Sequence, residues 1–260
     1  MTAQVKLKEL FYDVETAPLP VYVWRLGDQS VRHNQLIRDE NGKITFVKII
    51  CISYAWNDGG APKTLVWDKN HDSAAMIKKF DALIAQADVV IGKNSDRFDN
   101  KHINTHRLLN DGAAIPDWTK HTDDIEKQMR KHFNLPSYSL DYFADLLGVG
   151  LKSKMEWDDW IDIVERDDPK KLKKMIKYCE QDVRITRKVF NKIKTHVTLK
   201  LNPNVLSQGE QVCVHCQSPR ITKSGTRYYN KSLYQKFHCN AHHGYAGKAL
   251  IKKNGLGIIQ

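Results

Sequence analysis

The pattern of apolar and polar positions predicts a series of strands followed by helices. Runs rich in β-branched and aromatic residues predict strands over residues 5–14, 44–56, 61–67 and 88–94. The polar stretch between the first two strands, roughly residues 19–43, is expected to be a loop. Helical spacing predicts a helix after Asp72 or Ser73, either of which could cap it, and another over residues 97–110.

The following part of the chain is predicted to be helical. Two helical patterns lie within residues 122–147, separated by LPSYS, and a tryptophan-rich acidic helix is predicted over residues 156–165. Pro169 favours the first turn of a last, long helix. This order of elements predicts an α/β fold, in which a mixed sheet carries helices on its faces.

Composition and charge change near residue 200. The segment 200–211 looks like a linker, and residues 212–260 are rich in Cys, His, Tyr and Lys without a helical pattern. The chain has a formal net charge of +11, of which +8 falls in residues 200–260. A basic tail favours a polyanionic partner, nucleic acid first, and the alternative is an ordinary soluble basic face.

The sequence indicates a cytoplasmic protein. The N-terminal segment lacks an apolar region before a small-residue cleavage site, and no apolar run approaches the roughly 18 residues of a membrane helix. In a reducing compartment, the five cysteines are expected to be thiols or metal ligands rather than disulfides.

Two carboxylates end the first predicted strand, in FYDVET. Asp13 and Glu15 are two residues apart, so they share one face of the strand, roughly 6–7 Å apart. Two acids at the end of an apolar run repel each other unless a cation lies between them. The alternative is simply a charged strand end.

A third acid, Asp99, occurs in NSDRFD, after a predicted strand and at the start of a helix. The ordinary explanation is that Ser95 or Asp96 caps this helix and that Asp99 interacts favourably with its N-terminus.

The last candidate segment is YCEQD, on the long helix. Tyr178 and Asp182 are four residues apart and share a helix face. The alternative is a packed Tyr beside a solvated Asp, although apolar neighbours place Asp182 near the buried border. Glu180 and Gln181 are expected to face solvent.

FYDVET, NSDRFD and YCEQD, in this order, resemble the three motifs of the DnaQ-like 3′→5′ exonucleases of the ribonuclease H-like superfamily. Tyr178 is typical of their DEDDy branch, which includes polymerase proofreading domains and RNase D-like enzymes. The resemblance covers about residues 5–195 and extends to small phage-encoded exonucleases. It implies that residues 1–199 form a ribonuclease H-like 3′→5′ exonuclease domain.

The resemblance also implies roles for individual residues. Tyr178 would position the attacking water, and Asn94 and Phe98 match supporting positions of the second motif. The metal ligands would be four carboxylates, Asp13, Glu15, Asp99 and Asp182. Two divalent ions at such a site activate water and stabilise the leaving oxygen, and oxygen ligands suit Mg²⁺ or Mn²⁺ rather than Zn²⁺.

Other residues of the body carry weaker signals. His102 and His106 share a helix face but have no evident third ligand, so packing or solvation is the expected role. Trp157 and Trp160 could stack on bases, or simply pack against a helix. Four lysines could follow a phosphate backbone or form a solvated helix face: Lys170, Lys171, Lys173 and Lys174.

The C-terminal segment has the spacing of a zinc site. Cys213 and Cys216 form a Cys-x₂-Cys pair, and Cys239 begins a second pair that ends at His242 or, alternatively, His243. Three thiolates and one imidazole make a closed tetrahedral Zn²⁺ site, although His215 and His238 lie nearby too. The segment resembles the zinc ribbons of transposases, with a hairpin predicted around Gly225 and a further turn at NKS.

Residues 212–260 are therefore interpreted as a zinc-ribbon nucleic-acid-binding domain. Four aromatic residues lie among its basic residues, which suits base stacking and backbone contact: Tyr228, Tyr229, Tyr234 and Phe237. The expected function is cleavage from the 3′ end of single-stranded DNA, with RNA as the second choice. The alternatives are a nucleic-acid-binding adaptor on a nuclease scaffold, or a zinc ribbon that docks to a polymerase or another replication or recombination protein.

Overall fold

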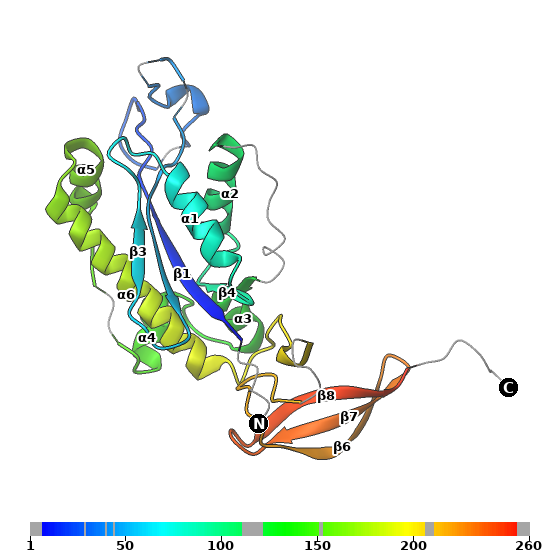
Figure 1. Ribbon diagram of the computed structural model, residues 1–260. Coiled ribbons are helices and arrows are strands. Elements are labelled where there is room, and N and C mark those ends of the chain that lie inside the picture. Colours follow the sequence, from blue (N-terminus) through cyan, green and yellow to red (C-terminus); the bar gives the residue numbers. More distant parts are fainter. Residues whose placement is uncertain are drawn as a thin grey trace.

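A five-stranded mixed sheet forms the centre of the body of the protein (Figure 1). The computed structural model describes residues 7–28, 30–39, 41–43, 45–110, 122–150, 153–205 and 211–253. In the order β3-β2-β1-β4-β5, the strands are β3 (Lys63–Val66), β2 (Ile49–Trp56), β1 (Glu9–Thr16), β4 (Val89–Gly92) and β5 (Thr122–Asp124). β2 runs antiparallel to both β3 and β1, whereas β4 runs parallel to β1 and β5 runs parallel to β4. The predicted α/β fold is confirmed.

Helices cover both faces of this sheet (Figure 1). The helices are α1 (Ala74–Ile84), α2 (Asp99–Asn110), α3 (Ile125–His132), α4 (Leu140–Leu146), α5 (Trp157–Arg166) and α6 (Pro169–Ile193). Side chains of β1 alternate between the two faces: Tyr12 packs against Phe80 of α1, whereas Phe11 packs against Phe190 of α6. Odd-numbered residues of β1 therefore face α6, and this face includes Asp13 and Glu15.

Several predicted boundaries are wrong. The first strand begins at Glu9, so residues 7 and 8 precede it, and the second begins at Ile49, so residues 45–48 precede it; the predicted starts at residues 5 and 44 lie outside the described residues. Residues 122–124 were expected within a helical pattern, but they form the edge strand β5, whose last residue caps α3. Here strand pairing with β4 outweighs local helical periodicity. The predicted loop after β1 contains one short 3-10 turn, His33–Gln35, and an isolated bridge between Val21 and Leu36.

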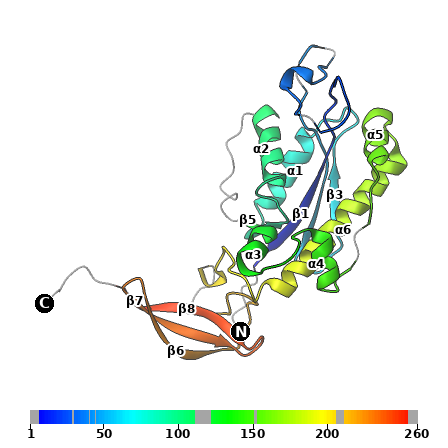
Figure 2. The ribbon, with the colours of Figure 1, turned by 180° about the vertical axis from the view of Figure 1, so that it is seen from behind.

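The C-terminal module, residues 211–253, contains a three-stranded antiparallel sheet (Figure 2). Its strands are β6 (Ile221–Tyr229), β7 (Ser232–Cys239) and β8 (Gly244–Lys252). The hairpin predicted around Gly225 is wrong, because Gly225 lies inside β6 next to a register shift. The β6–β7 turn falls at Asn230 and Lys231, both with positive φ, where NKS predicted only a further turn.

The module packs against the body at the start of β1. Gln217 accepts a hydrogen bond from the Leu7 amide at 2.8 Å and donates to the Glu9 carboxylate at 3.2 Å. His215 Nδ1 lies 2.9 Å from the carbonyl of Lys194, just after α6. Most of the predicted linker 200–211 is covered by the described chain, including the turn Pro203–Val205, but residues 206–210 lie outside it. Among the described residues, no helix has the length and apolar character needed to span a membrane.

Candidate functional site

Two of the candidate carboxylates lie where β1 meets α6. Asp13 and Glu15 are half-buried and pair in register with Ser53 and Cys51 of β2. The register shifts directly after Glu15, and such an irregularity re-aims side chains at the end of a strand. The thiol of Cys179, on α6, lies 3.6 Å from Asp13 Oδ2. Ligand atoms of Asp13, Glu15 and Cys179 all lie within 4.8 Å of one another.

Asp99 is hydrogen-bonded to the backbone of the same strand, between Asp13 and Glu15. It is the first residue of α2, and the Val14 amide donates to its Oδ1 at 2.9 Å. The carboxyl is buried, and burial raises its pKa to about 7. The charge of Asp124 acts in the same direction, while the Val14 amide opposes the shift. A cation near this carboxylate would favour its ionised form.

The third element is α6, which carries Tyr178 and Asp182 one turn apart. Asp182 is buried, and Tyr178 is half-buried with its ring at 6.5 Å from that of Trp160, edge to face. Cys179 lies between them in sequence and contacts Asp13, so this turn of α6 packs against the end of β1. The structure therefore brings Tyr178 and Asp182 to the face of β1 that carries Asp13 and Glu15.

The expectation for Glu180, two residues after Tyr178 on α6, is wrong. Glu180 was expected to face solvent, but it accepts a hydrogen bond from Thr64 on β3 at 3.2 Å and pairs with Arg184 at 3.3 Å. Thr64 in turn bonds Ser53, the partner of Asp13 on β2, at 2.8 Å. The side of α6 next to the site is thus connected to the sheet by a polar chain.

The loop before Asp99 is organised by an acid that the sequence analysis did not single out. Asp124 Oδ1 accepts from the Asn94 amide at 2.9 Å, and its Oδ2 accepts from the Asp96 amide at 3.2 Å. Asn94 has a φ of 58°, a conformation that asparagine adopts more readily than most residues. The segment DDIE has the sequence pattern of a helix N-cap, and this pattern could have identified Asp124.

Close packing shapes the same loop. A Cβ added at Gly92 would lie 2.5 Å from Ser95 Cβ and 3.2 Å from the Tyr12 ring, so only glycine fits there. Neither Ser95 nor Asp96 caps α2 as expected, since the helix begins only at Asp99 after a turn. Asp96 instead forms an ion pair with Lys127 at 2.7 Å.

The donor set at this end of β1 fits hard divalent cations. Asp13 and Glu15 cluster with Cys179, Asp99 is hydrogen-bonded to Val14 between them, and Asp182 lies one turn from Cys179 on α6. Asp99 and Asp182 are not part of the cluster of ligand atoms within 4.8 Å of one another. Carboxylate oxygens of this kind suit Mg²⁺ or Mn²⁺. Burial raises the pKa of Asp99, and the charge of Lys93 opposes this shift without cancelling it. A cation bound next to Asp99 would stabilise its ionised carboxylate.

The sequence profile of the RNase H superfamily matches residues 43–194 of the chain. The chain belongs to the RNase H superfamily. The matched region includes Asp99, Tyr178 and Asp182, whereas Asp13 and Glu15 precede it. Membership supports a nuclease, and RNase H-like nucleases use divalent metals.

A solved structure supports the same fold. The RNase H-like chain is similar to the family B DNA polymerase from the hyperthermophilic archaeon Pyrobaculum calidifontis, with a TM-score of 0.52 and 16% sequence identity. The similarity covers 73% of this chain and 25% of the polymerase chain, so it concerns the fold alone. No curated protein matches the chain.

A second candidate metal site lies in the C-terminal module. The ligand atoms of Cys213, Cys216, Cys239 and His242 all lie within 4.8 Å of one another. Cys213 Sγ lies 3.1 Å from His242 Nε2, and Cys216 Sγ lies 3.6 Å from Cys239 Sγ. Tetrahedral zinc with Zn–S bonds of about 2.3 Å would separate two sulfurs by roughly 3.8 Å, so the cluster has nearly the required size.

The histidine in this cluster is His242, the first of the two histidines that the sequence analysis considered as the fourth ligand. The alternative, His243, is exposed outside the cluster, and His215 is turned toward Lys194. Burial raises the pKa of the Cys213 thiol to about 12. A cation bound by this cluster would favour the thiolate forms of its cysteines.

The weaker candidates of the RNase H-like body have structural partners. His106 is buried between Ser73 Oγ and the Val47 carbonyl, and His102 packs on Phe98, as expected for packed histidines. Trp160 packs against Tyr178, whereas Trp157 is 66% exposed.

Two of the four lysines near the start of α6 bind an acid of α5. Lys171 and Lys174 both donate to Asp159 at 2.5 Å, so they join α6 to α5. Asp159 is itself buried, and these two lysines lower its pKa. Lys170 and Lys173 remain candidates for phosphate contact.

Proposed function

We propose that the protein is a metal-dependent 3′→5′ exonuclease that removes nucleotides from single-stranded DNA, with RNA as the second choice of substrate. The proposal is supported by the Asp13–Glu15 pair at one end of β1, and by two contacts that bring the elements carrying Asp99, Tyr178 and Asp182 to this strand. The Val14–Asp99 and Asp13–Cys179 contacts hold α2 and α6 to that strand.

In this proposal each residue has a defined task. The metal ligands are Asp13, Glu15, Asp99 and Asp182, which would together hold two Mg²⁺ or Mn²⁺ ions. When bound, these ions supply an activated water and neutralise charge on the phosphoryl oxygens. Tyr178 orients the water through its hydroxyl, and its ring is supported by Trp160. The Val14 amide keeps Asp99 in position without carrying a formal charge.

End-labelled oligonucleotides test the proposal directly. Single-stranded DNA, duplex DNA and RNA labelled at the 5′ end are digested with Mg²⁺, Mn²⁺ or EDTA. Stepwise shortening of the labelled single strand, dependent on the metal, is the expected result. Asp13→Asn and Asp182→Asn should abolish it, while Asp145→Asn, an exposed acid of α4, should not.

The same assay separates the rival hypotheses. An adaptor on a nuclease scaffold would bind the oligonucleotide and leave it intact with every metal. Activity that survives in both Asp13→Asn and Asp182→Asn would refute the assignment of the site. Tyr178→Phe should lower kcat by the order of a hundred-fold with little change in KM, because it misplaces the water rather than the substrate.

The C-terminal module is proposed to be a zinc ribbon that helps to bind the substrate. Its four-residue cluster would hold one structural Zn²⁺, and its sheet displays cations over aromatic rings. Lys248 Nζ lies 4.4 Å and 4.3 Å from the ring centroids of Tyr229 and Tyr234, and Arg227 lies over Tyr229 at 5.9 Å. This combination suits the backbone and the bases of a single strand.

Salt dependence tests this role in the full-length protein. The double variant Lys223→Gln, Arg227→Gln should weaken oligonucleotide binding and reduce the slope of log K against log salt by about 1 for each lost phosphate contact. An unchanged affinity and slope would favour the alternative, in which the module docks to a polymerase or recombinase.

A further inference from the structure

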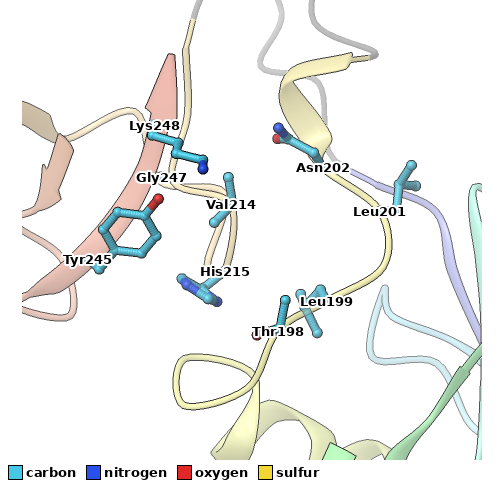
Figure 3. Close-up of a pocket in the computed structure, with 9 residues that line it drawn as sticks. All are labelled: Thr198, Leu199, Leu201, Asn202, Val214, His215, Tyr245, Gly247 and Lys248. Carbon is cyan, nitrogen blue, oxygen red and sulfur yellow. The ribbon is translucent and has the colours of Figure 1, made fainter. Parts of the chain in front are cut away.

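A groove lies between the C-terminal module and the segment that connects it to the body (Figure 3). Its volume is about 310 Å³, and one wall is formed by Thr198, Leu199, Leu201 and Asn202. Val214, His215 and part of β8 form the other. A smaller cavity of about 50 Å³ shares Asn202, Gly247 and Lys248 with it, so the groove continues along β8.

The walls of the groove are of the kind that binds a flat, partly apolar group. Tyr245 and His215 form one side, with ring centroids 6.4 Å apart and edge-to-face geometry. Leu199 and Leu201 line the opposite side (Figure 3) and pack on the body. The tyrosine is 50% exposed, so its ring is available for stacking.

One glycine permits the close approach of β8 to the first cysteine pair. Gly247 has a φ of 135°, and a Cβ there would lie 2.9 Å from Val214 Cγ1. Any other residue would strain the backbone and push the two walls apart. The shape of the groove therefore depends on this position.

The groove also has a cation and lacks competing anions. Lys248 lines both of its parts, and its ammonium group lies over the Tyr229 and Tyr234 rings. Of the described residues that line the two parts, none is an acid. An anionic group next to a flat group is the ligand that this arrangement favours.

We propose that this groove is a second binding site for single-stranded nucleic acid and holds one unstacked base, with a phosphate at Lys248. The inference rests on the proposed exonuclease function, since it assigns a further contact to that substrate. Continuity with the basic, aromatic surface of β6–β8 favours a nucleic acid over a peptide or a small molecule.

The position of the groove determines which nucleotide it binds. Gln217, next to the first cysteine pair, accepts a hydrogen bond from the Leu7 amide, and Asp13 lies six residues further along the chain, which is roughly 20 Å at 3.3 Å per residue. A stacked strand advances about 3.4 Å per nucleotide, so roughly six nucleotides separate the groove from the carboxylates. The groove should therefore hold a base near the sixth position from the 3′ end, and ignore di- and trinucleotides.

Abasic scanning tests the inference without altering the protein. A series of 12-nucleotide DNA strands, each with one abasic site, is titrated with the full-length protein in Mg²⁺-free buffer, where no cleavage occurs. The affinity should fall about five-fold to a hundred-fold for abasic sites around positions five to eight from the 3′ end. A flat profile, or losses confined to the last three positions, would overturn the proposal.

Variants identify the ring that makes the contact. Tyr245→Ala should reduce the affinity for the intact 12-nucleotide strand by a similar factor and remove the abasic effect, while Tyr245→Phe should retain both. Tyr22→Ala is the control, since Tyr22 is an exposed tyrosine in the loop after β1. The zinc content of each variant is measured, so that a variant in which the C-terminal module is unfolded is recognised. Equal affinities for Tyr245→Ala and the wild type would overturn the proposal.

Failure of this inference differs from failure of the proposed function. If the wild-type protein degrades 3′ ends in Mg²⁺ but shows a flat abasic profile, only the groove is wrong. If it binds strands with the expected profile but cleaves none with any metal, the exonuclease is wrong, and the groove then belongs to a binding protein.

Discussion

Gln217 connects the C-terminal module to the strand that carries Asp13 and Glu15, so its replacement tests whether the two parts act as one unit. Gln217 is 8% exposed, and Leu7 and Glu9, to which it is hydrogen-bonded, are each 2% exposed. Gln217→Ala removes the acceptor of the Leu7 amide and a donor to the buried Glu9 carboxylate.

The expected loss follows from these two contacts. A buried donor that loses its acceptor costs about 1–3 kcal/mol, and a hydrogen bond to a charged group contributes about 1.5–3 kcal/mol. Partial access of water to the new space reduces the sum, so we expect Gln217→Ala to lower the free energy of unfolding by about 2–4 kcal/mol. For a chain of this size the Tm should fall by roughly 4–15 °C.

Calorimetry and amide hydrogen exchange measure the effect. The Tm should fall and exchange should accelerate at the start of β1, because the strand loses its contact with the module. Gln86→Ala is the control, since that side chain is exposed and bonds only within its own helical turn at Ala82. If Gln217→Ala has the same Tm and β1 protection as the wild type, the module is merely tethered and the reasoning fails.

Three further predictions concern the metals and the pH. Mg²⁺ or Mn²⁺ should raise the Tm, by about 2.7 kcal/mol of stability at a hundred times Kd, and Asp13→Asn should blunt this rise in a thermal-shift titration; an equal rise would contradict the carboxylate site. In Mg²⁺-free buffer, the folded-state pKa of Asp99 is raised to about 7 by burial, so its contribution to stability is complete below about pH 4 and is lost as the pH rises through 7. Thermal melts of Asp99→Asn should therefore lose less stability than the wild type between pH 4 and pH 8, and parallel curves would contradict this. Elemental analysis should find about one Zn²⁺ per chain, and Cys213→Ser should lose it together with several degrees of Tm; a full zinc content in that variant would exclude the cluster.

Much of the candidate site could be predicted from local rules. The two-residue spacing of Asp13 and Glu15 places them on one face of a strand, and the four-residue spacing of Tyr178 and Asp182 places them on one face of a helix. The order of the three motifs supplied the idea that they meet. No local rule gives the contact between Cys179 and Asp13, because it depends on how α6 crosses β1.

The wrong predictions of secondary structure also arise from contacts between residues that are distant in the sequence. Residues 122–124 lie next to a helical pattern, and only pairing with β4 makes them a strand. Gly225 was taken as the tip of a hairpin, but β6 continues through it with a register shift, and the tip falls at Asn230. In both places contacts between strands outweigh the local preference of the residues. Likewise, nothing in the sequence around Gln217 indicates its docking on β1.

A chain of polar contacts joins the loop of Asp99 to the wall of the groove. Asp124 holds the amides of Asn94 and Asp96, and Asp96 lies 3.8 Å from the ammonium group of Lys200. The Lys200 amide donates to Asp123 at 3.1 Å, which ties this segment to β5.

Lys200 lies between Leu199 and Leu201, which line the groove, so the loop of one site and the wall of the other are parts of the same framework. On the proposed function, a strand held at both places would be bound at a constant spacing. Each removal of a nucleotide then requires the strand to advance past both sites. Because the ring contact at Tyr245 must break and reform at every step, Tyr245→Ala should shorten the run of cleavages per binding event more than it slows the first cleavage.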